Sequence, residues 1–373
     1  MEADKDIIRS SHLKRHKTNP EGGTTLAIPK KSFEETLAKV VSTERCAGCA
    51  ACTIVCPLGC LEYNGGQPKL VKECSTCGIC AAICPRYDFA ESSLEEFVFG
   101  RKRQLEEDFG IYRRIVAAQA NDQKVQQVCQ DGGVVTALTS FALENQIIDG
   151  AAMSGVSKDK PFLPVPTLVV SPEEVLECGA TRYSYSPNLL AFKEGVDTKK
   201  KNLAFVGTPC QVQAIRNIEM IPLKKYANPL KLTIGLMCTE CFTYEGLMEK
   251  QIQGEMGINL GDVKKINIKG QILVTTKSGE IKAISLRDAK QDTRGSCLQC
   301  SDFSSELADI SVGGLGLSGW TFTVIRSEKG EELFESAEKA GVLSTKPIGR
   351  EDRARDLLVK LSRNKRRAAG SLL

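Results

Sequence analysis

Eight cysteines between residues 46 and 84 form one spacing pattern twice. Cys46-Ala-Gly-Cys49-Ala-Ala-Cys52-Thr-Ile-Val-Cys56-Pro is followed by Cys74-Ser-Thr-Cys77-Gly-Ile-Cys80-Ala-Ala-Ile-Cys84-Pro. Each run reads C-x2-C-x2-C-x3-C-P, a spacing that holds [4Fe–4S] clusters. Three thiolates two residues apart wrap a loop around one corner of a cubane, while the fourth points away. The pattern therefore predicts iron–sulfur clusters and single-electron transfer.

The fourth cysteine of each run assigns the ligands. In two-cluster ferredoxins it ligates the cluster of the other run. The predicted ligand sets are Cys46, Cys49, Cys52 and Cys84 for one cluster, and Cys74, Cys77, Cys80 and Cys56 for the other. Zinc and disulfides are alternatives, but zinc sites usually pair their ligands and a disulfide framework does not need this periodicity. Cys60 is expected to be a structural thiol.

A second group of cysteines lies far downstream. Cys210 follows a predicted strand and a Gly-Thr-Pro turn, Cys238 and Cys241 follow another strand, and Cys297-Leu-Gln-Cys300 lies in a loop. Ligands of α/β sheets gather at the carboxyl ends of strands, where such loops converge. The spacing leaves two interpretations open: a zinc ion held by two C-x2-C pairs, and a third iron–sulfur cluster that includes Cys210.

Bulk properties restrict the function. The 373 residues suffice for two or three domains, and 16 cysteines without an apolar signal region favour metal ligands in a cytoplasmic protein. No apolar run approaches the roughly 18 residues of a membrane span. Both histidines lie in the polar N-terminal segment, so imidazole chemistry is not expected in the core. A net charge of +4 is too small to predict nucleic-acid binding.

Basic residues are concentrated near both ends of the chain, in Lys14-Arg-His-Lys17 and in Arg363-Asn-Lys-Arg-Arg367. A solvated tail or helix face is one interpretation of such runs. Docking to an acidic partner or to an anionic membrane surface is the other.

The chain divides into four predicted parts. Residues 1–42 form a polar extension, 43–90 a two-cluster ferredoxin domain, 91–113 a helical connector, and 114–373 a domain of alternating strands and helices, which is an α/β signature. Helices are predicted at 134–145, 211–219, 244–253, 331–340 and 352–365, with another starting at Ser171-Pro172. Strands are predicted at 148–156, 168–170, 202–206 and 231–236, and two or three antiparallel strands at 262–287.

Three spaced motifs carry a family resemblance. They are Gln130-Asp-Gly-Gly-Val-Val-Thr-Ala-Leu138, Val206-Gly-Thr-Pro-Cys-Gln-Val-Gln-Ala214, and Cys297-x2-Cys300-x-Asp302 followed by Ala308-Asp-Ile-Ser-Val-Gly313. Together they resemble the family of the coenzyme F(420) hydrogenase/dehydrogenase beta subunit over about residues 113–345. With the ferredoxin module in front, the arrangement resembles the electron-input subunit of F(420)H2 dehydrogenase, an enzyme of methanogenesis in archaea.

The resemblance implies a fold and its cofactors. The expected fold class is α+β / α/β: a bacterial-ferredoxin-like domain with two [4Fe–4S] clusters, followed by a mixed α/β domain that binds FAD beside a third. The family's ligand pattern resembles Cys210, Cys238, Cys297 and Cys300. The choice between Cys238 and Cys241 stays open.

The flavin site is predicted from glycine-rich and aromatic segments. Gly132-Gly133 precedes a helix whose free N–H groups favour phosphate, although an ordinary turn is an alternative. Gly314-Leu-Gly-Leu-Ser-Gly319 spells G-x-G-x-x-G, but a predicted strand at 320–325 follows it, so we reject the dinucleotide fingerprint. The candidate flavin contacts are Gly132, Gly133, Thr136, Tyr183, Ser184, Gly207, Thr208, Gly313 and Gly314.

The implied function is electron transfer from a hydride donor. Reduced coenzyme F(420) would pass a hydride to FAD, and single electrons would leave through the clusters to a ferredoxin or to partner subunits of a larger complex, for example a membrane-bound dehydrogenase that places the chain at the membrane periphery. The flavin carries the chemistry, so no catalytic side chain is required. Two alternatives remain: a ferredoxin-dependent reductase of another organic substrate, and a non-catalytic relay subunit.

Overall fold

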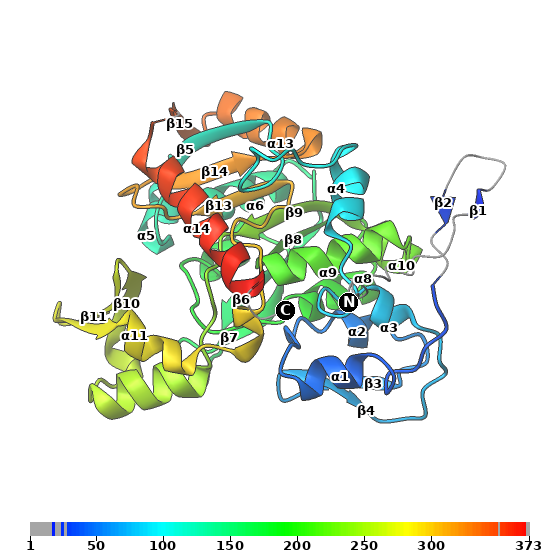
Figure 1. The fold of residues 1–373 in the computed structure, drawn as a ribbon. Helices are drawn as coiled ribbons and strands as arrows, with labels where there is room; N and C mark the ends of the chain where they lie inside the picture. The colour runs from blue at the N-terminus through cyan, green and yellow to red at the C-terminus, as the bar shows by residue number, and fades with distance from the viewer. Residues whose placement is uncertain (1–16, 19–23, 26–27, 350, 371–373) are drawn as a thin grey trace, which may run out of the picture.

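An eight-stranded mixed sheet forms the centre of the molecule in a computed structural model that describes residues 17–18, 24–25, 28–349 and 351–370 (Figure 1). Its strand order is β15-β5-β14-β13-β9-β8-β6-β7. The strands are β5 (Arg114–Ala120), β6 (Gly150–Val156), β7 (Pro164–Val169), β8 (Leu203–Gly207), β9 (Leu230–Leu236), β13 (Ile310–Gly313), β14 (Thr321–Ile325) and β15 (Leu343–Pro347).

Five of these strands point the same way. β6, β8, β9 and β13 pair in parallel, and β5 shares their direction because it pairs antiparallel with β14, which is itself antiparallel to β13. β7 and β15 run against them at the two edges of the sheet. The carboxyl ends of five strands therefore meet at one edge, where ligands of α/β folds collect.

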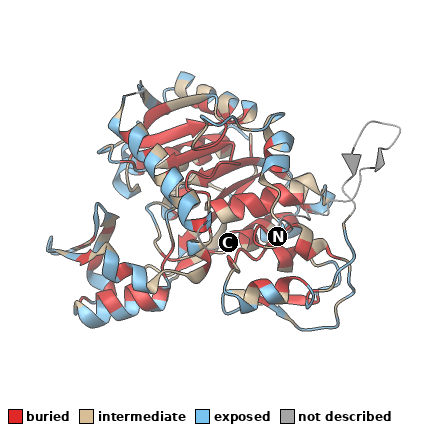
Figure 2. Ribbon diagram, in the orientation of Figure 1, coloured by how far each residue is buried: buried red, intermediate tan, exposed pale blue. Residues whose placement is uncertain are grey.

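Helices cover both faces of the sheet. One face carries α5 (Gln123–Val128), α6 (Val134–Glu144), α7 (Pro172–Glu177) and α13 (Glu328–Lys339), and the other carries α8 (Leu189–Asp197), α9 (Pro209–Met220) and α10 (Lys224–Ala227). The start of α7 follows from its sequence, because the Ser171 side chain accepts the Glu174 N–H and proline occupies the first turn. Figure 2 shows the strands buried between these layers. The expected mixed α/β fold is confirmed.

A small lobe projects from the main body (Figure 1). It contains the antiparallel strands β10 (Val263–Ile268), β11 (Gln271–Thr276) and β12 (Ile281–Ser285), with a π-helix η1 (Glu245–Glu255), η2 (Leu260–Asp262), α11 (Leu286–Ala289) and η3 (Lys290–Asp292). The helix and the three strands were both expected here. The lobe has its own apolar core, which includes Leu247, Ile252 and Ile272.

The cysteine-rich segment packs against α8 and α9. It contains α1 (Leu37–Ser42), α2 (Ala51–Ile54), β3 (Leu61–Asn64), β4 (Gln67–Leu70) and α3 (Ile79–Ala82). Its buried apolar residues form one core with those of the main sheet layer. Asn217 Nδ2 donates to the Ile83 carbonyl at 3.2 Å, and the Tyr226 hydroxyl donates to the Ile54 carbonyl. That this segment is a ferredoxin-like domain stays a prediction.

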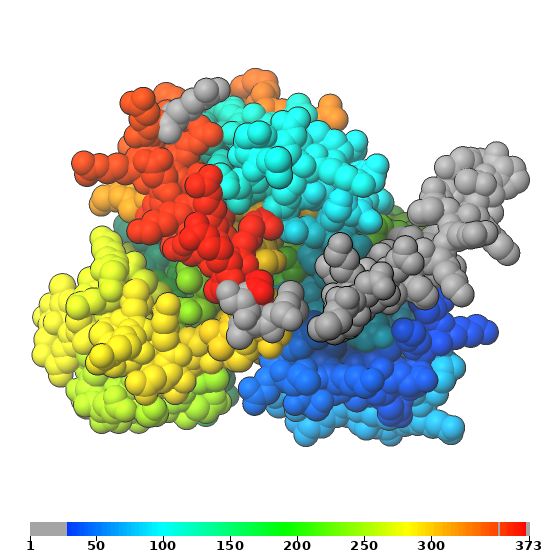
Figure 3. Space-filling view, viewed as in Figure 1, coloured from blue at the N-terminus to red at the C-terminus, as the bar shows by residue number. Residues whose placement is uncertain are grey.

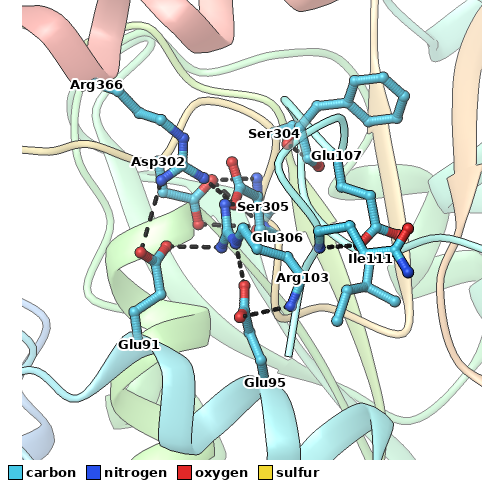
Figure 4. A network of polar contacts seen from close by, with 12 residues as sticks. Glu91, Glu95, Arg103, Glu107, Ile111, Asp302, Ser304, Ser305, Glu306 and Arg366 are labelled. Atoms are coloured by element: carbon cyan, nitrogen blue, oxygen red, sulfur yellow. Dashed lines mark hydrogen bonds and ion pairs between the residues drawn. The ribbon is translucent and has the colours of Figure 1, made fainter. Parts of the chain in front are cut away.

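The connector is less helical than expected. Only α4 (Glu91–Phe99) is helical between residues 91 and 113, because Gly100 at φ 70° ends it with a left-handed residue. The following segment is held instead by ion pairs: Arg103 contacts Glu91 at 2.9 Å, Glu306 at 2.5 Å and Glu95 (Figure 4). The continuous helical connector was wrong for its second half.

The C-terminal helix α14 (Arg353–Gly370) lies across the molecule between the small lobe and the segment around α4 (Figure 3). The remaining elements are α12 (Gly295–Leu298) and the two-residue strands β1 (Lys17–Thr18) and β2 (Thr24–Thr25). Most of the predicted polar extension 1–42 before residue 28, including both histidines, lies outside the described residues. Within the part of the chain that the structure describes, none of the helices has both the length and the apolar character needed to cross a bilayer.

Candidate functional site

The two cysteine runs share an unusual backbone conformation. Gly48 and Thr76, which occupy equivalent places in the runs, have φ values of 67° and 53°. Ala50 and Gly78, also equivalent, have φ values of 66° and 73° and directly precede α2 and α3. Positive φ is uncommon for residues other than glycine. The internal repeat in the sequence is therefore also a repeat in the backbone.

The thiols group as the spacing predicts. One cavity is lined by Cys46, Cys49, Cys52 and Cys84. In the other group, Cys80 interacts electrostatically with Cys77, Cys74 and Cys56. The last cysteine of each run thus joins the first three of the other. Iron binding at either place stays a prediction.

Backbone N–H groups point at several of these sulfurs. Gly48 donates to Cys46 Sγ at 3.4 Å, Phe33 to Cys74 Sγ at 3.3 Å, and Cys60 to Cys56 Sγ at 3.2 Å. Such hydrogen bonds to sulfur are one of the factors that set cluster potentials. Cys60 itself donates to the Glu73 carbonyl, as a structural thiol would.

Burial opposes ionisation of these thiols. It raises the pKa of Cys84 to about 11 and the pKa of Cys80 to about 12. Thiolates at these positions therefore need a compensating positive charge, which bound metal supplies.

Five downstream cysteines line a second cavity: Cys210, Cys238, Cys241, Cys297 and Cys300. They come from the first turn of α9, the loop after β9, and α12 with the segment that follows it. We call this the five-thiol cavity. These cysteines therefore lie close together in the fold, which their spacing in the sequence could suggest but not establish.

The thiols of this cavity are not equivalent. The Cys238 and Cys241 sulfurs are 3.9 Å apart, and the Cys241 N–H donates to Cys297 Sγ at 3.4 Å. Hydrogen bonding from Cys241, with Arg294 and Lys365 nearby, lowers the pKa of Cys297 to about 6, so this thiol ionises readily. Both Cys238 and Cys241 line the cavity, and the choice between them stays open.

Neighbouring hydroxyl groups face Cys210. The Tyr185 hydroxyl lies 3.6 Å from Cys210 Sγ and the Thr208 hydroxyl 3.4 Å from it. Thr208 is the N-cap of α9 and Pro209 is its first residue, a favourable helix start that presents Cys210 at the carboxyl end of β8. Within the described ranges, no three His, Cys, Asp or Glu side chains surround one metal-ion position.

The basic C-terminal run does not form a purely solvated face. Lys365 Nζ donates to the Cys238 carbonyl and lines the five-thiol cavity, and Arg366 pairs with Glu306. Arg363 pairs with Asp108 at 2.7 Å. The interpretation as a solvated helix face is therefore wrong for Lys365 and Arg366, which pack on a carbonyl and a carboxylate of the protein, whereas the Arg363 side chain is 55% exposed. Docking to a partner or to a membrane stays a prediction.

Two predicted flavin segments meet at the carboxyl edge of the sheet. Gly132 N–H donates to the Thr321 hydroxyl at 3.0 Å, and a Cβ on Gly132 would lie 2.3 Å from the Ala118 carbonyl oxygen. A Cβ on Gly314 would lie 2.2 Å from Asp131 Oδ2. The Gly132 turn and the end of β13 are therefore in close approach, with Gly133, Thr136 and Gly313 in the adjoining α6 and β13.

Ser184 is buried near this edge, and Tyr183 beside it is half-buried. Burial raises the pKa of Tyr183, and nearby Asp131 adds to the rise. The Ser184 hydroxyl is buried without a hydrogen-bond partner in the described residues. Thr208 lines the five-thiol cavity instead, next to Gly207. No helix follows Gly314–Gly319, since β14 comes next, so rejection of the dinucleotide fingerprint is confirmed.

Several residues at these sites were not predicted. Arg86, Arg294 and Lys365 line the five-thiol cavity. At the flavin edge, Lys265 Nζ donates to the Gln130 carbonyl at 3.1 Å, which ties the small lobe to the Gln130-Asp-Gly-Gly motif. The position of Arg86 directly after Cys84-Pro85 could have indicated from the sequence that it lies near a cysteine site. The others depend on tertiary placement.

Comparisons with known proteins agree with this arrangement. Residues 115–193 and 200–351 match the N-terminal and C-terminal models of the coenzyme F(420) hydrogenase/dehydrogenase beta subunit. The beta subunit of coenzyme F(420) hydrogenase from Methanococcus voltae is 37% identical over 261 residues, which are 69% of this chain and 92% of that protein.

Two further matches extend the comparison. A subunit of the F(420)H(2) dehydrogenase of Methanosarcina mazei is 31% identical over 306 residues, 80% of this chain and 84% of that protein. A chain in the F(420)-reducing [NiFe] hydrogenase complex from Methanosarcina barkeri superposes with a TM-score of 0.69 at 32% identity, covering 72% of this chain and 94% of that one.

Proposed function

Because this chain belongs to the family of the coenzyme F(420) hydrogenase/dehydrogenase beta subunit, whose members include F(420)-linked oxidoreductase subunits, we propose that it oxidises reduced coenzyme F(420). A hydride passes to FAD, and single electrons leave through three [4Fe–4S] clusters to a ferredoxin or a partner subunit. The observation that carries the proposal is the five-thiol cavity at the carboxyl edge of the sheet, between the flavin segments and the paired cysteine runs.

The residues at the edge of the sheet fit a flavin. Gly132 and Gly314 let the Gly132 turn pack closely on β5 and β14 and the segment after β13 pack closely on Asp131, which brings the candidate flavin segments together. Gly133 begins α6, whose free N–H groups suit a phosphate. The unpaired Ser184 hydroxyl is available to the ligand. When bound, the flavin accepts two electrons as hydride and releases them one at a time.

The cysteine sites fit iron–sulfur clusters. Thiolates are the usual ligands of these clusters, and backbone N–H groups already point at Cys46, Cys56, Cys74 and Cys297. Cys210, Cys238, Cys297 and Cys300 are the proposed ligands of the third cluster. A zinc ion needs four ligands about 2.3 Å from one point, whereas the thiols here line a cavity.

The outlet is proposed at the second ferredoxin-type site. Cys74 and Cys77 are separated by the exposed residues Ser75 and Thr76, whereas the equivalent residues of the first run, Ala47 and Gly48, are buried. A redox partner can therefore come closest to the site of Cys74, Cys77, Cys80 and Cys56. Membrane association would then depend on the partner complex.

Anaerobic mixing with reduced coenzyme F(420) tests the reaction. We expect bleaching of the flavin absorbance followed by loss of the iron–sulfur absorbance. Absence of bleaching in a preparation with full flavin and cluster content would refute the proposal and would favour a relay subunit. A matched preparation without flavin should reduce no clusters on the same timescale.

Metal analysis tests the third cluster independently. Three cubanes require about twelve irons per chain, and two require about eight. Cys210→Ala should lower the count from about twelve to about eight, while Cys60→Ala should leave it unchanged. About eight irons together with one zinc in the wild-type chain would instead establish the four-thiolate zinc site.

A further inference from the structure

Two of the thiol cavities share a wall. Ala47 and Arg86 line both the cavity of Cys46, Cys49, Cys52 and Cys84 and the five-thiol cavity. We call the first the inner ferredoxin site. Cys74, Cys77 and Cys80 line neither cavity, so their site lies farther along the route.

Arg86 is a buried cation without a carboxylate partner in the described part of the chain. Arg86 is 8% exposed. Its Nε has no hydrogen-bond partner, and its Nη1 donates to the adjacent Pro85 carbonyl at 3.3 Å. Of the thiols near it, Cys300 and Cys210 line the five-thiol cavity and Cys84 lines the inner ferredoxin site. A buried charge is very costly unless it is paired. Because Arg86 lines both cavities, the thiolate ligands of a cluster bound on either side would compensate its charge.

Arg294 reinforces the same wall from the other side. Its Nη1 donates to the Ala47 carbonyl at 3.0 Å, and its guanidinium lies 4.1 Å from the centre of the Tyr185 ring. It interacts electrostatically with Cys46 of the inner ferredoxin site and with Cys297 of the five-thiol cavity. Two independent arginines thus connect the same pair of sites.

Lys365 provides a contrast. It donates to the Cys238 carbonyl, and its neighbours among the thiols are Cys300, Cys238 and Cys297. It lines the five-thiol cavity and is not among the residues that line the inner ferredoxin site. Lys365 is therefore a cation of the five-thiol cavity alone.

We propose that Arg86, supported by Arg294, is a shared cation that tunes two adjacent clusters together and makes the inner ferredoxin site the one that receives electrons from the five-thiol cavity. This inference rests on the proposed function. A cluster becomes more negative when it is reduced, so a nearby cation stabilises its reduced form. Loss of the cation should lower the reduction potential of both clusters that it faces.

A redox titration of the full chain, followed anaerobically by electron paramagnetic resonance, tests the proposal. The signals are assigned with Cys77→Ala and Cys210→Ala, which each remove one cluster. At a fixed potential, Arg86→Gln should lower the ratio of reduced to oxidised cluster about tenfold, or 59 mV for one electron, at the five-thiol and inner sites only. Lys365→Gln should affect the five-thiol site alone, and Arg86→Lys should retain most of the wild-type ratio at both.

The outcomes separate this inference from the proposed function. Three clusters with unchanged potentials in Arg86→Gln, or a shift at one site only, overturn the shared cation and leave the proposed function intact. Only two clusters in the wild-type chain overturn both. If Arg86→Gln does not assemble its clusters, the potentials of Arg86→Lys and Lys365→Gln are compared instead. A change in the reduction potentials of both the five-thiol and the inner site in Lys365→Gln would overturn the inference, because Arg86 would then not differ from Lys365.

Discussion

Replacing Arg216 with methionine tests how strongly a buried ion pair supports the sheet behind the site. The guanidinium of Arg216 is 2% exposed and contacts Asp309, which is fully buried, at 2.9 Å. Asp309 begins the turn into β13, and Thr233 N–H in β9 also donates to it at 2.7 Å. The pair therefore joins two of the strands whose carboxyl ends carry the five-thiol cavity and the Gly313-Gly314 segment.

Burial decides the size of the expected effect. An exposed ion pair contributes up to about 1 kcal/mol, whereas removal of one partner of a buried pair costs about 3–5 kcal/mol because the other charge is left uncompensated. Among the residues that the structure describes, Arg216→Met leaves the buried Asp309 carboxylate with only the partly exposed Lys329 as a counter-charge, at 3.5 Å. For a domain of this size, the expected loss in unfolding free energy corresponds to a fall in Tm of about 6–20 °C.

Thermal unfolding of the anaerobically prepared protein, followed by circular dichroism at one scan rate, provides the assay. Lys329→Met is the matched control, because Lys329 is 37% exposed and lies 3.5 Å from the same carboxylate. We expect its Tm to fall much less. The double variant Arg216→Met/Asp309→Asn should recover part of the loss, because the amide is neutral and its oxygen can still accept the Thr233 N–H. The reasoning is refuted if Arg216→Met lowers Tm no more than Lys329→Met does.

Three further predictions follow from the structure. Although burial opposes ionisation, Arg216 and Lys329 lower the pKa of Asp309. The stability that the ionised carboxylate contributes is therefore present above about pH 4 and lost below it, so the Tm difference between wild type and Asp309→Asn should shrink below about pH 4. A Tm difference that stays constant with pH would contradict this prediction. Gly132→Ala places a Cβ 2.3 Å from the Ala118 carbonyl oxygen, so the turn must move and the free energy of unfolding should fall by about 1–3 kcal/mol. The flavin content per chain should fall as well. An unchanged flavin content and an unchanged Tm would contradict a close-packed turn at the flavin site. Tyr226→Phe removes the hydrogen-bond donor to the Ile54 carbonyl, and the unpaired carbonyl should destabilise the cysteine-rich segment by about 1–3 kcal/mol. Amide hydrogen exchange in that segment should therefore be faster than in the wild type. Equal exchange rates would show that this hydrogen bond does not hold the segment in place.

Local sequence signals predicted much of the fold. Ser171-Pro172 placed the start of α7, and apolar segments predicted strands β6, β7, β8, β9 and β14 of the main sheet. The pairing of Cys84 with the first run also followed from spacing, because the geometry of each run is local and repeated. The strand after Gly319 was sufficient to reject the G-x-G-x-x-G fingerprint of a Rossmann-type turn at Gly314–Gly319.

The conformation of the connector after Gly100 and the position of the C-terminal basic residues depend on tertiary contacts, so the sequence did not predict them. The segment after Gly100 has charged residues in a helix-like pattern, but ion pairs of the half-buried Arg103 with the buried Glu95 and Glu306 hold it in an irregular conformation (Figure 4). A basic C-terminal run is usually solvated, yet Lys365 reaches the five-thiol cavity because α14 crosses it. Neither side-chain direction can be read from periodicity, since each depends on a partner more than a hundred residues away.

Electron flow through the five-thiol cavity is the central claim, and freeze-quench electron paramagnetic resonance after anaerobic mixing with reduced coenzyme F(420) tests it most directly. In the wild-type chain we expect the flavin to bleach and the two ferredoxin-type clusters to become reduced. In Cys300→Ala, the flavin should still bleach while those two clusters remain oxidised on the same timescale. Reduction of both clusters in Cys300→Ala at the wild-type rate would contradict the account, because electrons would then reach them without the five-thiol cavity.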